Sequence, residues 1–157
     1  VLSAVRSSWH EQWGHEWLPV LETQMRERHE THGDLADLLE PDIKESHGGL
    51  RDLNVLRAVG VSFPDLYRFV DADDLAEAEA VLLTVRVAMH RIAKRDQNRL
   101  LLQDQDEVAR RVDVQDADVL MRSVSEAGRT IARASDTAWR RRSAWQSDTQ
   151  TAELIPA

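Results

Sequence analysis

A stripe of apolar side chains along residues 71–95 is the feature that most constrains the fold of this chain. Its members are Leu75, Ala78, Leu82, Val85, Met89 and Ile92, separated by steps of three and four residues. This spacing places all six side chains on one face of an α-helix. Acidic residues dominate the first turns and basic residues the last turn, which is the order that complements a helix dipole. We therefore predict a long helix with one buried face.

A second stripe of the same kind runs through residues 115–142. Its members are Leu120, Val124, Ala127, Ile131, Ala134 and Ala138. Asp113 or Asp116 would cap this helix at its start. Because several members are alanine, a neighbouring helix can come close, and we expect the two long helices to pack against each other.

Weaker helical patterns occupy most of the remaining chain. We expect a helix over the first thirty residues, kinked or broken at Pro19 because proline has no N–H group. Short helices are expected near residues 50–59, 64–70 and 104–111, the first stopped by Gly60 and the second capped by Ser62. The predicted fold class is all-α, a helical bundle with two long packed helices and several short ones. We divide it into an N-terminal helical region (1–35), a helical domain (36–145) and a frayed tail (146–157).

Composition excludes several classes of function. The 157 residues include no cysteine, which removes disulfides, thiolate zinc sites and thiol catalysis, and favours a cytoplasmic location. The longest apolar run covers residues 80–83, far below the roughly 20 residues that a membrane span requires. The net charge of −8 opposes binding to nucleic acid or anionic lipid. We expect a soluble cytoplasmic protein that binds neither nucleic acid nor membrane, and the start at Val1 suggests a piece of a longer protein.

The segment EPDIKESHGGLRDL, residues 40–53, interrupts the helical patterns with a proline and a glycine pair. Lys44 and Arg51 bracket Gly48 and Gly49 immediately before a predicted helix. Backbone N–H groups at a helix start, a glycine turn and two cations can together form a seat for phosphate. The alternative is a rigid structural turn, in which the two cations pair with neighbouring acids, Glu45 and Asp52 among them. Residue types alone leave both interpretations open.

Two histidines near the end of the first predicted helix invite a metal interpretation. His29 and His32 are three residues apart and could face one ion, but the sequence offers no obvious third ligand. A solvated helix end is the simpler interpretation, and we predict no metal site in this chain.

The 40–53 segment resembles the Glu-Pro-Asn-Ile-Lys-Glu-Gly-x-Gly-Gly-Leu-Arg-Asp signature of the protein-PII uridylyltransferases, the bifunctional enzymes of bacterial nitrogen sensing. Residues 90–100, HRIAKRDQNRL, resemble a second segment of that family. This chain departs from the signature at Asp42, where asparagine is common, and at Ser46, where glycine is usual. We therefore expect its loop to be stiffer than in relatives.

The resemblance implies a parent enzyme with several domains. Such enzymes attach a nucleotidyl group from UTP, or from ATP in some relatives, to the PII signalling protein when nitrogen is scarce. A separate hydrolase domain removes it when glutamine is plentiful. This chain is then the helical domain, with the edge of the nucleotidyltransferase domain at residues 1–35. It lacks the family's glycine-rich turn followed by Asp-x-Asp, the motif that carries the metal ions, so we expect no catalytic residue in it and no transferase activity from it alone.

Within that parent, the resemblance implies a supporting role at the nucleotide. Lys44, Gly48, Gly49 and Arg51 are expected near the phosphates, with Glu45 and Asp52 as supporting charge pairs. The alternative from a different class is a non-catalytic helical module that docks PII or relays the state of distant sensor domains.

Overall fold

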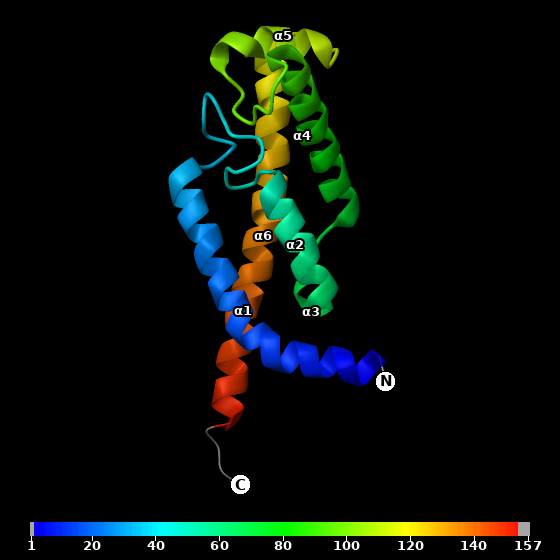
Figure 1. The fold of residues 1–157 in the computed structure, drawn as a ribbon, viewed down its shortest axis with the longest axis vertical. Coiled ribbons are helices and arrows are strands. Elements are labelled where there is room, and N and C mark those ends of the chain that lie inside the picture. Colours follow the sequence, from blue (N-terminus) through cyan, green and yellow to red (C-terminus); the bar gives the residue numbers. More distant parts are fainter. Residues whose placement is uncertain (1, 154–157) are drawn as a thin grey trace.

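The computed structural model describes the backbone of residues 2–153 and the side chains of residues 17–142. Figure 1 shows its helices and their labels. In chain order these are α1 (Leu2–His32), α2 (Leu50–Ser62), α3 (Pro64–Tyr67), α4 (Ala72–Ala93), the 3-10 turn η1 (Leu102–Asp104), α5 (Gln105–Arg111) and α6 (Ala117–Glu153). Residues 2–153 contain no β-strand, only two isolated bridges that join Asp34 to His47 and Asp42 to Arg99. The all-α fold class is confirmed.

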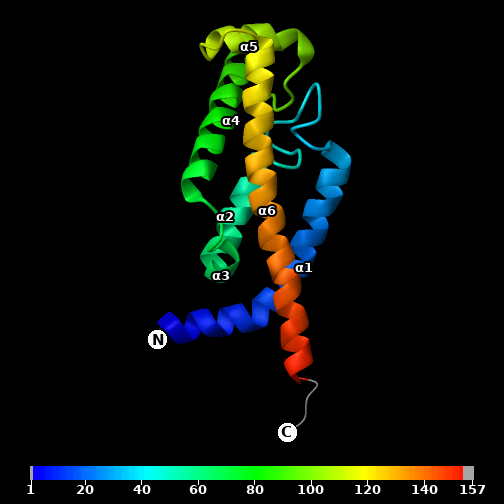
Figure 2. The same ribbon diagram turned by 180° about the vertical axis from the view of Figure 1, so that it is seen from behind.

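The two long predicted helices are α4 and α6, and they lie side by side in both views (Figures 1 and 2). The Asp71 side chain caps α4 by accepting hydrogen bonds from the backbone N–H groups of Asp73 and Asp74 at 3.0 and 3.2 Å. At the start of α6, Asp116 accepts from the N–H of Val119 at 2.8 Å. The two apolar stripes meet in one core, as their spacing predicts.

α1 bends sharply in its N-terminal half (Figures 1 and 2), and Pro19 lies inside it. Proline cannot donate to the carbonyl four residues earlier and its ring crowds that carbonyl, so the kink expected at this position is present. The rest of α1 crosses α6, and Glu22 of α1 forms an ion pair there with Arg142 of α6.

Three helix ends differ from the sequence-based expectations. α2 continues through Gly60, because the absent side chain makes room for the ring of Tyr67; a Cβ at this position would lie 2.6 Å from that ring. Ser62 therefore still belongs to α2, and Phe63 stands at the N-cap of the short α3 instead. α6 extends past the expected end to Glu153, since no glycine or proline interrupts residues 146–153, and the expected fraying of residues 146–157 remains a prediction. Residues 154–157 lie outside the described residues, and the domain boundaries at 35 and 145 remain predictions.

The connection between α1 and α2, residues 33–49, is part of the core and not a surface loop. Leu35 and Ile43 are fully buried against residues of the helices, such as Leu53, Leu82 and Ile131. Burial of these two side chains positions the intervening charged residues. No described helix is both long and apolar enough to cross a lipid bilayer.

Candidate functional site

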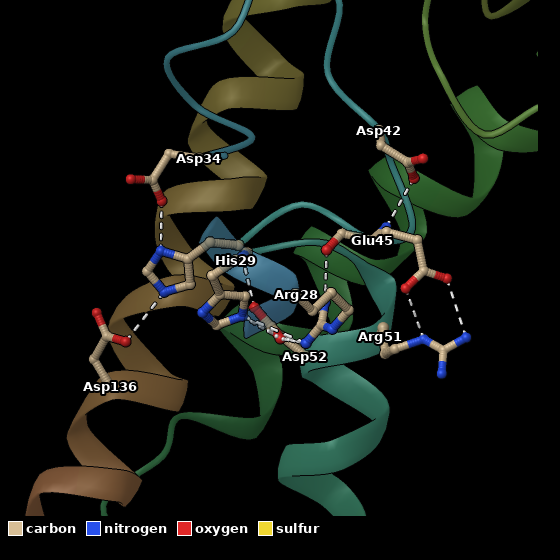
Figure 3. Close-up of polar contacts among 10 residues, drawn as sticks. Arg28, His29, Asp34, Asp42, Glu45, Arg51, Asp52 and Asp136 are labelled. Carbon is tan, nitrogen blue, oxygen red and sulfur yellow. Dashed lines mark hydrogen bonds and ion pairs between the residues drawn. The ribbon is translucent and has the colours of Figure 1, made fainter. Parts of the chain in front are cut away.

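The carboxylate of Asp52, in the first turn of α2, is the centre of the candidate site (Figure 3). It is fully buried and has three partners. Its Oδ2 accepts a hydrogen bond from the backbone N–H of Gly48 at 2.8 Å, and its Oδ1 lies 2.9 Å from Nε2 of His29. The guanidinium of Arg28 forms an ion pair with the same Oδ1. Two side chains of α1 thus hold the start of α2.

Opposing effects act on the pKa of Asp52. Burial alone would raise this pKa, because the charged form loses its hydration. The hydrogen bond from His29 and the positive charge of Arg28 outweigh burial, so the pKa of Asp52 lies below its ordinary value. The carboxylate is therefore charged at neutral pH, where it anchors its three donors.

Further hydrogen bonds from the end of α1 and within the loop fix the 33–49 connection. Arg28 donates a second hydrogen bond to the carbonyl of Glu45 at 2.7 Å. The buried Ser46 donates its hydroxyl to the carbonyl of His32 at 3.1 Å, and Asp42 accepts from the N–H groups of Lys44 and Glu45 at 2.9 and 2.8 Å. Both residues that depart from the family signature, Asp42 and Ser46, thus bond within the connection or to α1. Position 46 does not need glycine, since the positive φ values in this connection fall at Gly33 and Gly48.

Glu45 is the partner of both predicted phosphate-binding cations, and Figure 3 shows its contact with Arg51. Its Oε1 lies 3.3 Å from Nζ of Lys44, and its Oε2 lies 2.9 Å from Nε of Arg51. The side chains of Lys44 and Arg51 are 34% and 49% exposed, so the cluster of Glu45, Lys44 and Arg51 faces outward. Of the two acids singled out in the sequence, only Glu45 pairs with these cations, because Asp52 turns inward to α1.

The glycine pair makes room for the chain's own backbone. A Cβ at Gly48 would lie 2.3 Å from the carbonyl oxygen of Gly128 in α6, and one at Gly49 would lie 2.8 Å from the carbonyl oxygens of Lys44 and Ser46. Gly48 also has a φ of +83°, a conformation that favours glycine. Both glycines therefore allow the turn to sit tightly between α2 and α6.

The N–H groups at the start of α2 already have acceptors. Gly49 donates to the carbonyl of Ser46 at 2.8 Å, and Leu50 and Arg51 donate to the carbonyls of Ile43 and Lys44, both at 3.0 Å. The exposed side chains of Lys44 and Arg51 are therefore what this end of α2 offers to a ligand.

A second ion-pair cluster is centred on His47, and its two acids, Asp34 and Asp136, lie beside the first cluster in Figure 3. Nδ1 of His47 pairs with Asp34, and its Nε2 lies 3.1 Å from Oδ1 of Asp136 in α6. The hydrogen bond to Asp136 is the main reason why the pKa of His47 rises to about 9, with Asp34 adding to it and burial opposing it. Protonated His47 thus ties the connection to α6.

Sequence reasoning missed most of this network. Arg28 carried no signal, and His29 was considered only with His32, whereas its actual neighbours are Asp52 and the ring of His47, 4.4 Å away between centroids. Asp136 sits on an exposed helix face 89 residues from His47, and no local pattern links them.

His29, His47 and Asp52 are the one group among the described residues whose ligand atoms lie close enough together to suggest a metal ion. The donor set does not fit magnesium, which prefers oxygen ligands, because two of the three donors are imidazoles. The guanidinium of Arg28 also occupies the carboxylate oxygen that would face the ion. Both ring nitrogens of His47 also pair with carboxylates, so these three residues belong to the ion-pair network.

The fold and site together define a helical domain built around a charged glycine turn. A family model described as GlnD PII-uridylyltransferase matches residues 20–61 and 65–139. The chain belongs to this family.

Curated relatives agree with the family match. The chain is 46% identical over 140 residues to a bifunctional uridylyltransferase/uridylyl-removing enzyme of Streptomyces coelicolor, an alignment that covers 88% of this chain and 16% of the relative. It is 37% identical over 108 residues to the enzyme of that name from Mycobacterium tuberculosis, covering 63% and 13%. The Acinetobacter baumannii enzyme is 36% identical over 97 residues, covering 55% and 11%. The chain thus spans less than a fifth of the length of these relatives, and no solved structure matches it.

Proposed function

We propose that this chain is the helical domain of a bifunctional cytoplasmic enzyme that transfers a uridylyl group to PII and also removes it. In this proposal the domain packs on the nucleotidyltransferase domain and helps to position UTP, or ATP if the enzyme adenylylates. Magnesium and the reacting groups belong to the catalytic domain, in the part of the relatives that the chain does not cover. The contribution of this chain is positioning and charge.

The observation that supports this role is the contrast between the inward and outward side chains of one short segment. Asp52 points inward and fixes the segment to α1 through Arg28 and His29. Lys44 and Arg51 point outward and keep a third to a half of their exposure. A rigid support that carries exposed cations suits recognition of a triphosphate, because little side-chain or loop ordering is needed on binding.

Nucleotide phosphate could replace Glu45 as the partner of these cations. Without nucleotide the single carboxylate of Glu45 pairs with both cations, which leaves one positive charge in excess, and a triphosphate would compete with it for the guanidinium of Arg51. Arginine can form two parallel hydrogen bonds with a phosphate group, so Arg51 would make the more directional contact and Lys44 would contribute a point charge.

A second candidate is a non-catalytic module that docks PII or relays the state of sensor domains. Two observations favour it: the first N–H groups of α2 are bonded within the chain, and both cations already have a carboxylate partner. Under this alternative, Glu45, Lys44 and Arg51 form a surface salt-bridge cluster that contacts protein and no nucleotide.

Variants of the longer enzyme that carries this chain distinguish the two candidates. Lys44→Ala and Arg51→Lys should each slow transfer to PII by roughly 10- to 150-fold, the effect of losing one charge-assisted hydrogen bond to an anion. Removal of the group, which runs in another domain, and the melting temperature should change little. Arg57→Lys is the matched control, because Arg57 also lies on α2 but pairs with Glu79 of α4. Wild-type transfer by the Lys44 and Arg51 variants would reject the nucleotide role and favour the docking module.

A further inference from the structure

α4 carries a second apolar stripe, on the face opposite its buried one. The stripe consists of Ala76, Ala80, Leu83 and Val87, which follow one another by four, three and four residues. All four are exposed, Leu83 to 41% and Val87 to 47%. A helix that is apolar on two faces is normally covered on both. In Figures 1 and 2, α4 lies along the outer side of the bundle, and among the described helices only the end of α5 approaches this face, near Arg91.

Opposite charges stand at the two ends of this stripe. Asp73 precedes Ala76 by three residues and Arg91 follows Val87 by four, so both lie on the same face of α4 as the stripe. Both side chains are exposed, and neither has an ion pair within the part of the chain that the structure describes. They are about 27 Å apart along the helix, too far to pair with each other.

This face is complementary to itself when two copies run antiparallel. Ala76 then lies opposite Val87 of the second copy, and Ala80 opposite Leu83, so each small side chain meets a large one. The same register places Asp73 within one residue of the position opposite Arg91, so the two side chains can pair at both ends. We propose that the exposed face of α4 docks against the same face of a second copy of this chain, antiparallel, with the two-fold axis near residues 81 and 82.

A hollow at the basic end of the stripe supports this pairing. It has a volume of about 350 Å³, lies between α4 and α5, and is lined by residues that include Thr84, Val87, Arg91, Arg111 and Val112. Asp73 of the second copy would enter at this end and meet Arg91. Arg111, which pairs with Glu107 at 2.9 Å, supplies a second guanidinium nearby.

The size of the contact sets the expected strength. One pair of helices of about six turns each buries less surface than a standard stable interface, so the dimer should be weak and should depend on protein concentration. Sedimentation of the chain at concentrations up to about 1 mM, where even a millimolar dissociation constant is detectable, should show a monomer–dimer equilibrium.

Leu83→Glu should weaken dimerisation at least about tenfold, because it buries two unpaired carboxylates at the centre of the contact. Leu102→Glu is the matched control, since Leu102 is 61% exposed but lies in η1, outside α4. This control should leave the dissociation constant unchanged.

Charge reversal tests the antiparallel register. Asp73→Arg alone and Arg91→Asp alone should each lower dimerisation, because each places like charges opposite one another at both ends. A mixture of the two variants should form a heterodimer, in which both ends again carry opposite charges. The proposal is wrong if the wild-type chain stays monomeric, if Leu83→Glu has no more effect than Leu102→Glu, or if mixing the reversed variants restores nothing. A strictly monomeric chain would assign this face to another part of the longer protein.

Discussion

Arg28 and Asp52 form an ion pair that is removed from solvent, with 13% of the arginine side chain and none of the aspartate exposed. Each partner also bonds to the connection between the helices. Arg28 donates to the carbonyl of Glu45, and Asp52 accepts from the N–H of Gly48. One ion pair therefore fixes the positions of α1, α2 and the charged turn, and the outward direction of Lys44 and Arg51 depends on it.

Asp52→Ala should destabilise the chain by about 3–5 kcal/mol, because it leaves the charge of Arg28 without its buried partner and the N–H of Gly48 without its acceptor. Chemical denaturation at neutral pH measures this loss. Glu79→Ala provides the comparison: its partner Arg57 keeps 41% exposure, and the expected loss is about 0–1 kcal/mol. Equal losses in the two variants would contradict the anchoring role of Asp52.

Gly48→Ala should cost about 3 kcal/mol or more, since the strain of a left-handed backbone adds to overlap with the carbonyl of Gly128. Gly33→Ala is the matched variant. Gly33 also has a positive φ, of +67°, but an added Cβ there would meet only the movable side chain of Leu38 at 3.2 Å. Its expected cost is about 1–2 kcal/mol. A ranking with Gly33→Ala as the more damaging change would show that Gly48 does not lie against α6.

The His47 cluster predicts how stability depends on pH. The pKa of His47 is about 9 in the folded chain and 6.5 without its partners, so protonated His47 stabilises the fold fully below pH 6.5. This stabilisation declines as pH rises towards 9, where the folded chain loses the proton. Asp34 and Asp136 are half-exposed, so solvent screening reduces the loss to about 1–2 kcal/mol.

Denaturation curves recorded from pH 6 to pH 9.5 test this dependence. His47→Gln should be less stable than the wild type at pH 6 and should match it more closely at pH 9.5, because glutamine carries no proton to lose. A constant difference in unfolding free energy between the two proteins across this range would contradict the ion pairing of protonated His47 with α6.

The long helices could be predicted from the sequence because each is encoded locally. Spacing alone predicts the stripe that begins at Leu75. Single residue types predict the caps Asp71 and Asp116 and the kink at Pro19. The end of α2 was wrongly predicted at Gly60. The role of this glycine depends on its packing against the ring of Tyr67, seven residues away, and not on helix propensity.

The part of the site that is encoded locally was also predictable. The 40–53 segment was recognisable, and one predicted pairing, between Glu45 and the two cations, is present. The direction of Asp52 was not predictable, because its partners Arg28 and His29 lie on another helix. The contact between Gly48 and Gly128 joins residues 80 positions apart. A glycine pair in the sequence does not show whether a ligand or a neighbouring helix fills the space that the missing side chains leave.

The chain itself closes the start of α2, so that only side chains remain for a ligand. Amide hydrogen exchange of Gly48, Gly49, Leu50 and Arg51, followed by NMR, tests this closure most directly. We expect these four amides to exchange more than about 100-fold slower than in an unfolded chain, which corresponds to an opening free energy above about 2.7 kcal/mol. Exchange of these amides at rates close to the unfolded chain would contradict the claim and restore the backbone seat for phosphate.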